Sequence, residues 1–99
     1  MRRFGEKFNR VHELEVRFLK TDLDVGLTRA RIAAQTKHGS EKWRRNATEA
    51  KKAYDAVLQF RAQTELRPEQ ASSIDEKLTE LRKAIEELGL DAKEKALTE

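Results

Sequence analysis

The stretch FLKTDLDVGLTRARIAAQTKHGSEKW, residues 18–43, predicts a long amphipathic helix, its end and the start of a second helix. Apolar residues recur here at spacings of three and four, which puts them on one face of a helix; with one upstream member they are Val16, Leu19, Leu23, Leu27, Ala30 and Ala34. Asn9 can cap the start of this helix, and Gly39 suits the left-handed conformation that follows a helix end. We therefore expect a first helix over residues 9–38, about 43 Å long.

A second helix is expected directly after Gly39, over residues 40–64. Ser40 can cap it, and Glu41 lies favourably at its positive end. One stripe of positions at helical spacing is expected to face the rest of the protein: Trp43, Ala47, Ala50, Tyr54, Val57, Leu58 and Arg61.

A third helix is expected over residues 68–88, because Pro68 suits a first helical turn and the residue before a proline favours an extended backbone. Its apolar face consists of Ala71, Ile74, Leu78, Leu81, Ile85 and Leu88, and Gly89 follows as its stop. Ser73 and Glu76 also form a capping-box pattern, so a later start at Ser73 remains open.

The two links between these helices are short, and short links make neighbouring helices antiparallel. The chain has 99 residues, of which 37% are apolar and 39% are charged, a composition typical of one small helical domain. The expected fold is therefore an all-α, up-down-up three-helix bundle with a long first helix. It occupies residues 9–90, between a basic N-terminal extension at 1–8 and a polar C-terminal tail at 91–99.

Composition also excludes several classes of protein. The sequence contains no cysteine, so it has no disulfide, thiolate metal site or cysteine nucleophile. It has no run of about 20 apolar residues that could span a membrane, and its N-terminus lacks the apolar stretch of a signal peptide. We expect a cytoplasmic protein that does not associate with membranes.

The first helix has a second apolar row, roughly opposite the first one on the helix surface. Its members are Val11, Leu14, Phe18, Val25 and Ile32, mostly at intervals of seven. In one interpretation the helix is a wedge, and the other two helices cover one row each. In the other, the second row stays exposed and packs against another chain, since a seven-residue period is the geometry of long helix pairs. The second interpretation predicts a homo-oligomer or a helical partner.

Candidate catalytic groups do not form a site at these spacings. Asp22 and Asp24 are two residues apart and point about 200° away from each other on a helix, so their carboxylates cannot share a proton or an ion. His12 and His38 are separated by roughly 39 Å of helix. The sequence has no glycine-rich phosphate loop and no Ser/His/Asp set. We expect no catalytic residue, no metal ligand and no cofactor.

Charge is distributed unevenly along the chain. Residues 1–62 carry fifteen Lys and Arg against eight Asp and Glu, whereas residues 63–99 carry six against ten. Six cations surround the first link and are candidates for binding phosphates or other anions: Arg29, Arg31, Lys37, Lys42, Arg44 and Arg45. The acidic third helix could instead neutralise them within the bundle.

The segment RNATEAKKAYDAVLQF, Arg45 to Phe60, resembles the second helix of tetratricopeptide-like and microtubule-interacting-and-trafficking-like helical hairpins in its spacing of alanine and aromatic residues. Those families carry a pattern of Trp, Leu, Gly and Tyr on the preceding helix. Here that helix offers Leu23, Gly26, Leu27 and Ala30 without the aromatic residues. The resemblance implies a helical hairpin packed on small residues and a groove for a partner helix.

Taken together, these patterns predict a small non-enzymatic interaction or scaffold protein. It would act through helix–helix contacts with a second copy or with another helical protein. The alternative is an accessory protein that binds nucleic acid through the six cations around the first link.

Overall fold

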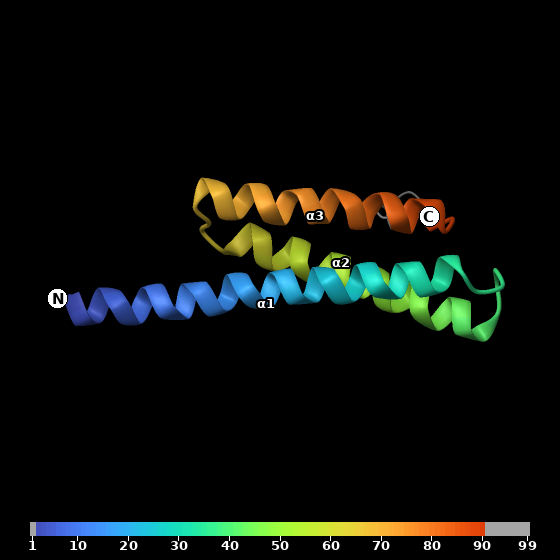
Figure 1. The fold of residues 1–99 in the computed structure, drawn as a ribbon, viewed down its shortest axis with the longest axis horizontal. Helices are drawn as coiled ribbons and strands as arrows, with labels where there is room; N and C mark the ends of the chain where they lie inside the picture. Colours follow the sequence, from blue (N-terminus) through green and yellow to red (C-terminus); the bar gives the residue numbers. More distant parts are fainter. Residues whose placement is uncertain (1, 91–99) are drawn as a thin grey trace.

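Across residues 2–90, which the computed structural model describes, the chain forms three helices and no strand. They are α1 (Arg2–Ala34), α2 (Glu41–Gln63) and α3 (Pro68–Glu87), and side chains are described from residue 13 onward. The helices run up, down and up, and each packs against the other two (Figure 1). The predicted all-α three-helix bundle is confirmed. The tail predicted at 91–99 lies outside the described residues.

The first helix has different bounds from those predicted. It begins at Arg2 instead of near Asn9, so most of the stretch expected as a separate extension at 1–8 is helical. An asparagine inside a helix costs less than about 1 kcal/mol relative to alanine, too little to force a start at that point. With 33 residues the helix is about 50 Å long, and its N-terminal part extends past the link between α2 and α3 (Figure 1).

The C-terminal end of α1 is at Ala34, whereas residue 38 was predicted. Thr36 explains the earlier end, because its hydroxyl donates to the carbonyl of Ile32 at 2.6 Å and its backbone N–H donates to the carbonyl of Ala33 at 3.0 Å. These bonds satisfy carbonyls that a continuing helix would otherwise use. Gly39 has a φ of +86°, a backbone conformation that favours glycine. It lies inside the link and does not directly follow the last residue of α1, as had been predicted.

The starts of α2 and α3 agree with the predicted caps. Ser40 accepts a hydrogen bond from the backbone N–H of Trp43 at 3.1 Å, as expected of an N-cap. The third helix begins at Pro68, where the backbone N–H of Arg67 donates to Oε1 of Gln70 at 3.0 Å. The alternative start at Ser73 is therefore wrong.

The core is formed by the predicted face of each helix, with small shifts in position. Its buried members are Val16, Leu19, Leu23, Leu27, Ala30, Ala33, Ala47, Ala50, Tyr54, Val57, Ile74, Leu78, Leu81, Ile85 and Leu88. Two predicted members are exposed: Ala34, whose place Ala33 takes, and Leu58. The rest of the predicted α2 stripe is buried or partly buried, including Trp43 at the edge of the core and Arg61.

All three helices meet at Gly26. A Cβ added there would lie 2.8 Å from Cδ2 of Leu81 on α3 and 3.0 Å from Cβ of Ala53 on α2. Both distances are shorter than normal van der Waals contact, so the absence of a side chain lets α1 approach its two partners closely. This contact also sets the antiparallel register of α1 and α2.

Two ion pairs join α3 to the other helices. Arg61 of α2 makes two hydrogen bonds to the carboxylate of Asp75, at 3.0 and 3.1 Å, and the hydrogen bond to this carboxylate raises the pKa of Arg61. Lys77 donates to Asp24 of α1 at 2.6 Å. Each pair is partly open to solvent and is expected to orient α3 more than to stabilise it.

Candidate functional site

The second apolar row of α1 is exposed in the bundle. The exposed fractions are 56% for Leu14, 57% for Phe18 and 47% for Val25, and Ile32 is half-buried. We call these four residues the outer face of α1; the side chain of Val11, the fifth predicted member, lies outside the described residues. The wedge interpretation is wrong, because α2 and α3 leave most of this row uncovered.

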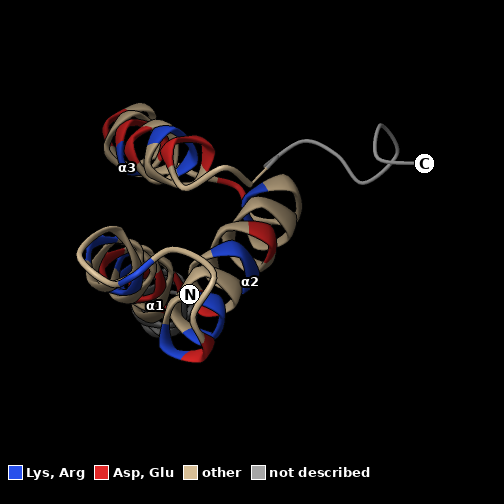
Figure 2. Cartoon of the chain, turned by 90° about the vertical axis from the view of Figure 1, so that its right-hand side faces the viewer, with Lys and Arg blue, Asp and Glu red and all other residues tan. Residues whose placement is uncertain are grey.

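The outer face lies on the α2 side of α1, away from α3. Arg29 reaches Asn46 of α2 and Asp24 reaches Lys77 of α3. Five residues separate Arg29 from Asp24, which puts them about 140° apart around α1. On the same helical wheel Phe18 and Val25 fall within about 40° of Arg29. The end-on view in Figure 2 shows α2 and α3 on different sides of α1.

An exposed phenylalanine of α2 continues this apolar surface. Phe60 is 47% exposed and follows Ala53, the α2 contact of Gly26, by two helical turns. Because the helices are antiparallel, two turns forward on α2 correspond to two turns back on α1, which is the level of Phe18. Phe60 therefore extends the outer face onto α2. The sequence prediction missed it because it does not belong to the stripe that fills the core.

A short hydrogen-bonded chain lies beside the outer face. Asn46 is buried, at 5% exposure; its Nδ2 donates to the carbonyl of Lys42 at 2.9 Å, and its Oδ1 accepts from Nη1 of Arg29 at 3.2 Å. Anchored this way, the amide holds the guanidinium of Arg29 against α2. Four of the five N–H donors of that guanidinium remain for other partners.

The six candidate cations do not form one surface. Arg29, Lys42 and Arg45 line a hollow between α1 and α2 together with Ile32, Gln35, Thr36 and Asn46. Arg31 lines a different hollow, whose lining also includes Glu87 of α3, and Lys37 is exposed in the link. Arg44 is exposed and donates to the carbonyl of Gly39 at 3.2 Å. The three ion pairs found among residues 13–90 use none of the six.

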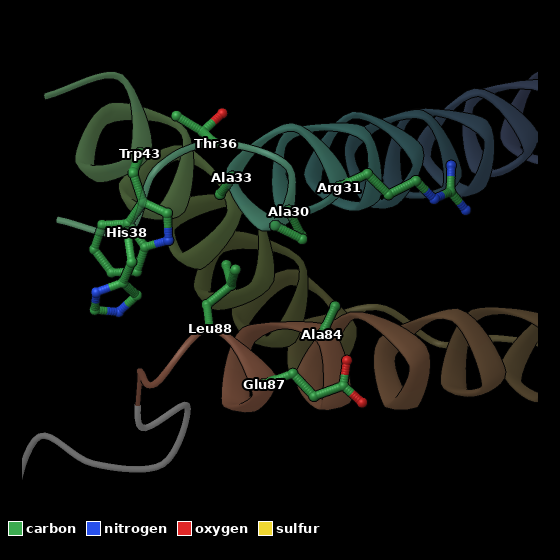
Figure 3. Close-up of a pocket in the computed structure, with 10 residues that line it drawn as sticks. Ala30, Arg31, Ala33, Thr36, His38, Trp43, Ala84, Glu87 and Leu88 are labelled. Atoms are coloured by element: carbon green, nitrogen blue, oxygen red, sulfur yellow. The ribbon is translucent and has the colours of Figure 1, made fainter. Parts of the chain in front are cut away.

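The hollow lined by Arg31 opens between the end of α1, the first link and the end of α3 (Figure 3). Its walls include Ala30, Ala33, Ala84, Trp43 and Leu88, and Arg31 extends away from the two rings at its mouth. Its volume of about 350 Å³ is at the lower limit for a small-molecule site, and it holds no converging set of polar groups.

The ring of His38, in the first link, contacts the ring of Trp43. The ring centroids are 4.3 Å apart and the planes are tilted by 48° (Figure 3). Nε2 of His38 also lies 3.8 Å from where a Cβ on Gly89 would be. This exposed histidine therefore lies at the end of the bundle, between the first link and the end of α3.

The candidate acid groups remain separate. Asp24 binds Lys77 on the α3 side of α1, and Asp22 lies on the opposite, α2 side of the same helix. Among the residues the structure describes, no three His, Cys, Asp or Glu side chains gather where they could hold a metal ion. The side chain of His12 is outside the described part.

The chain matches no known family model, no characterised protein and no solved structure. Within residues 2–90, no helix has both the length and the hydropathy needed to cross a membrane.

Proposed function

We propose that this chain is a non-enzymatic helical interaction module that binds another protein chain along the outer face of α1. One observation carries the proposal: Leu14, Phe18 and Val25 are each about half exposed, although the same helix buries Leu19 and Leu23 almost completely. We place this function in the cytoplasm, because a chain without cysteine depends on no oxidising compartment.

Large apolar side chains lined up on one helix face favour a helical partner. Scattered exposed apolar residues are normal, whereas a contiguous row bordered by polar groups is typical of a protein-binding surface. The row follows helical periodicity over about 27 Å, from Leu14 to Ile32, so an amphipathic helix laid along it could cover every member. The small α2 residue Ala53 and Gly26 of α1 keep the two helices close.

The first experiment compares the wild-type chain with Phe18→Glu/Val25→Glu. Both substitutions lie on the outer face, so they should abolish complexes seen by light scattering or by capture while leaving helicity unchanged. Leu58→Glu is a matched control, because Leu58 is 45% exposed but lies three residues before Arg61, on the α3 side of α2. Identical complexes formed by wild type and the double variant would contradict the proposal.

A second candidate function is nucleic-acid binding, favoured by the three cations that converge on one hollow, Arg29, Lys42 and Arg45. Phosphate contacts of this kind weaken steeply as salt rises. Lys42→Glu/Arg45→Glu should then remove salt-sensitive binding to a labelled oligonucleotide, whereas Lys51→Glu/Lys52→Glu should retain more of it. If the wild-type chain does not bind the oligonucleotide even at about 50 mM salt, nucleic-acid binding is contradicted.

A further inference from the structure

We propose that the occupant of the outer face is a second copy of this chain, whose α1 lies antiparallel to the first with the two Val25 residues opposite each other. This inference rests on the proposed function, because it names the partner for the same surface. It follows from a symmetry in the apolar and charged residues of α1.

The apolar residues of the outer face are spaced symmetrically about Val25. Phe18 precedes Val25 by seven residues and Ile32 follows it by seven. In an antiparallel pair centred there, Phe18 of each copy lies opposite Ile32 of the other. A large aromatic side chain, more than half exposed, then meets a smaller, half-buried one at both ends. The resulting interface is self-complementary, as a two-fold dimer requires.

The charges bordering this face are arranged with the same symmetry. Asp22 precedes Val25 by three residues and Arg29 follows it by four, and both lie on the α2 side of the face. Antiparallel pairing brings Asp22 of each copy within one residue of the level of Arg29 of the other, so two opposite-charge pairs form. Parallel pairing in register would put these flanking residues of the two copies on opposite edges of the interface, so neither pair would form. The charges therefore favour the antiparallel orientation.

Arg29 is already held in position for this contact. The buried amide of Asn46 accepts one hydrogen bond from its guanidinium, and Asn46 is itself anchored to the carbonyl of Lys42. Asp22 is half-buried, so its carboxylate is also confined near the surface of the helix. Less side-chain freedom is lost when such a pair forms than between two fully mobile side chains.

Cysteine cross-linking tests the orientation directly, because the natural sequence contains no cysteine. Thr21 and Thr28 are both exposed and border the outer face, and their substitution changes neither its apolar residues nor its charges. In the proposed dimer, position 21 of one copy lies within one residue of the level of position 28 of the other. Oxidation of an equal mixture of Thr21→Cys and a tagged Thr28→Cys should therefore give the mixed disulfide several-fold above either homodimer.

Charge reversal provides the second part of the test. Asp22→Arg and Arg29→Asp should each weaken dimerisation by roughly three- to ten-fold, and the double variant, in which the pairs re-form with signs exchanged, should recover most of the affinity. Failure of the double variant to recover would overturn the pairing of these two residues.

The outcomes separate this inference from the proposed function. Homodimers of Thr21→Cys and of Thr28→Cys in excess of the mixed disulfide would overturn the antiparallel alignment centred on Val25, while leaving the proposed surface intact. If the wild-type chain is a monomer at about 50 µM and the Phe18→Glu/Val25→Glu variant loses a protein that the wild type captures, then the occupant of the outer face is not a second copy. If the wild-type chain is a monomer and no captured protein depends on Phe18 and Val25, then both this inference and the proposed function are overturned.

Discussion

The inner face of α1, which packs in the core, and its outer face consist of the same kinds of residue at the same helical spacing. The bundle nevertheless covers only the inner face. Leu19 and Leu23 are almost completely buried, whereas Phe18 and Val25 are about half exposed. Two short partner helices can surround one side of a long helix but not both. The difference teaches that periodicity identifies which residues share a face, while the number and placement of the neighbouring helices decide which face becomes core.

The difference between the two faces is tested most strongly by shortening one side chain on each of them. Leu23→Ala removes buried atoms and leaves a cavity, so we expect it to lower the free energy of unfolding by about 2–5 kcal/mol, most of the stability of so small a domain. Val25→Ala should cost less than about 0.5 kcal/mol in dilute protein, because its side chain is nearly half exposed. Urea unfolding followed by circular dichroism measures both, and equal losses would contradict the assignment of the two faces.

Gly26 is buried against both partner helices, directly after Val25 of the outer face, and Gly26→Ala sharpens the comparison at this point. The substitution gains about 1 kcal/mol of helix propensity, but its methyl group would lie 2.8 Å from Leu81 and 3.0 Å from Ala53. Overpacking of this kind costs about 1–3 kcal/mol, so we expect a net loss of about 1 kcal/mol. Adding Leu81→Ala should reduce the cost of Gly26→Ala, and stabilisation by Gly26→Ala alone would show that the helices can separate freely.

Asn46 links the core to the outer face through Arg29. Asn46→Ala leaves the guanidinium without its α2 partner and the carbonyl of Lys42 without its side-chain donor, and we expect a loss of about 1 kcal/mol in thermal or urea unfolding. Thr48→Ala is the control, since Thr48 is an exposed residue of the same helix. Equal effects of the two substitutions would show that the buried amide does not support the structure.

The smallest expected effect concerns the ion pairs of α3. A double-mutant cycle on Arg61 and Asp75 should give a coupling of less than about 1 kcal/mol that declines with added salt, because both side chains are partly open to solvent. The hydrogen bond that raises the pKa of Arg61 favours its charged form, so this coupling should not be lost on the basic side of neutrality. A coupling well above that value, or one insensitive to salt, would mean that α3 is held mainly by its charges.

Much of the fold is predictable from local signals. The core stripes of the three helices, the cap at Ser40 and the start at Pro68 follow from spacing and from backbone chemistry. The ends of α1 were misplaced because Asn9 is a weak cap signal and because the side-chain bond of Thr36 to Ile32 competes with the helix. Helix ends depend on such small local energies, and these do not appear in a hydrophobic pattern.

The candidate surface was only partly predictable, because exposure depends on how helices are arranged in space. Periodicity identified Leu14, Phe18, Val25 and Ile32 as one row, but it could not decide whether other helices cover them. The contribution of Phe60 and the clamp of Asn46 on Arg29 depend on the register of α1 against α2. The six cations are close in sequence, yet the turn at the first link distributes them over different surfaces.

Dependence of the unfolding midpoint on protein concentration tests most directly the claim that a second copy covers the outer face of α1. Unfolding that also separates a dimer becomes harder as concentration rises, by about 1.4 kcal/mol per mole of dimer for each ten-fold increase. The wild-type midpoint should therefore rise with concentration, and that of Phe18→Glu/Val25→Glu should stay constant. A wild-type midpoint that does not change with concentration would contradict the account.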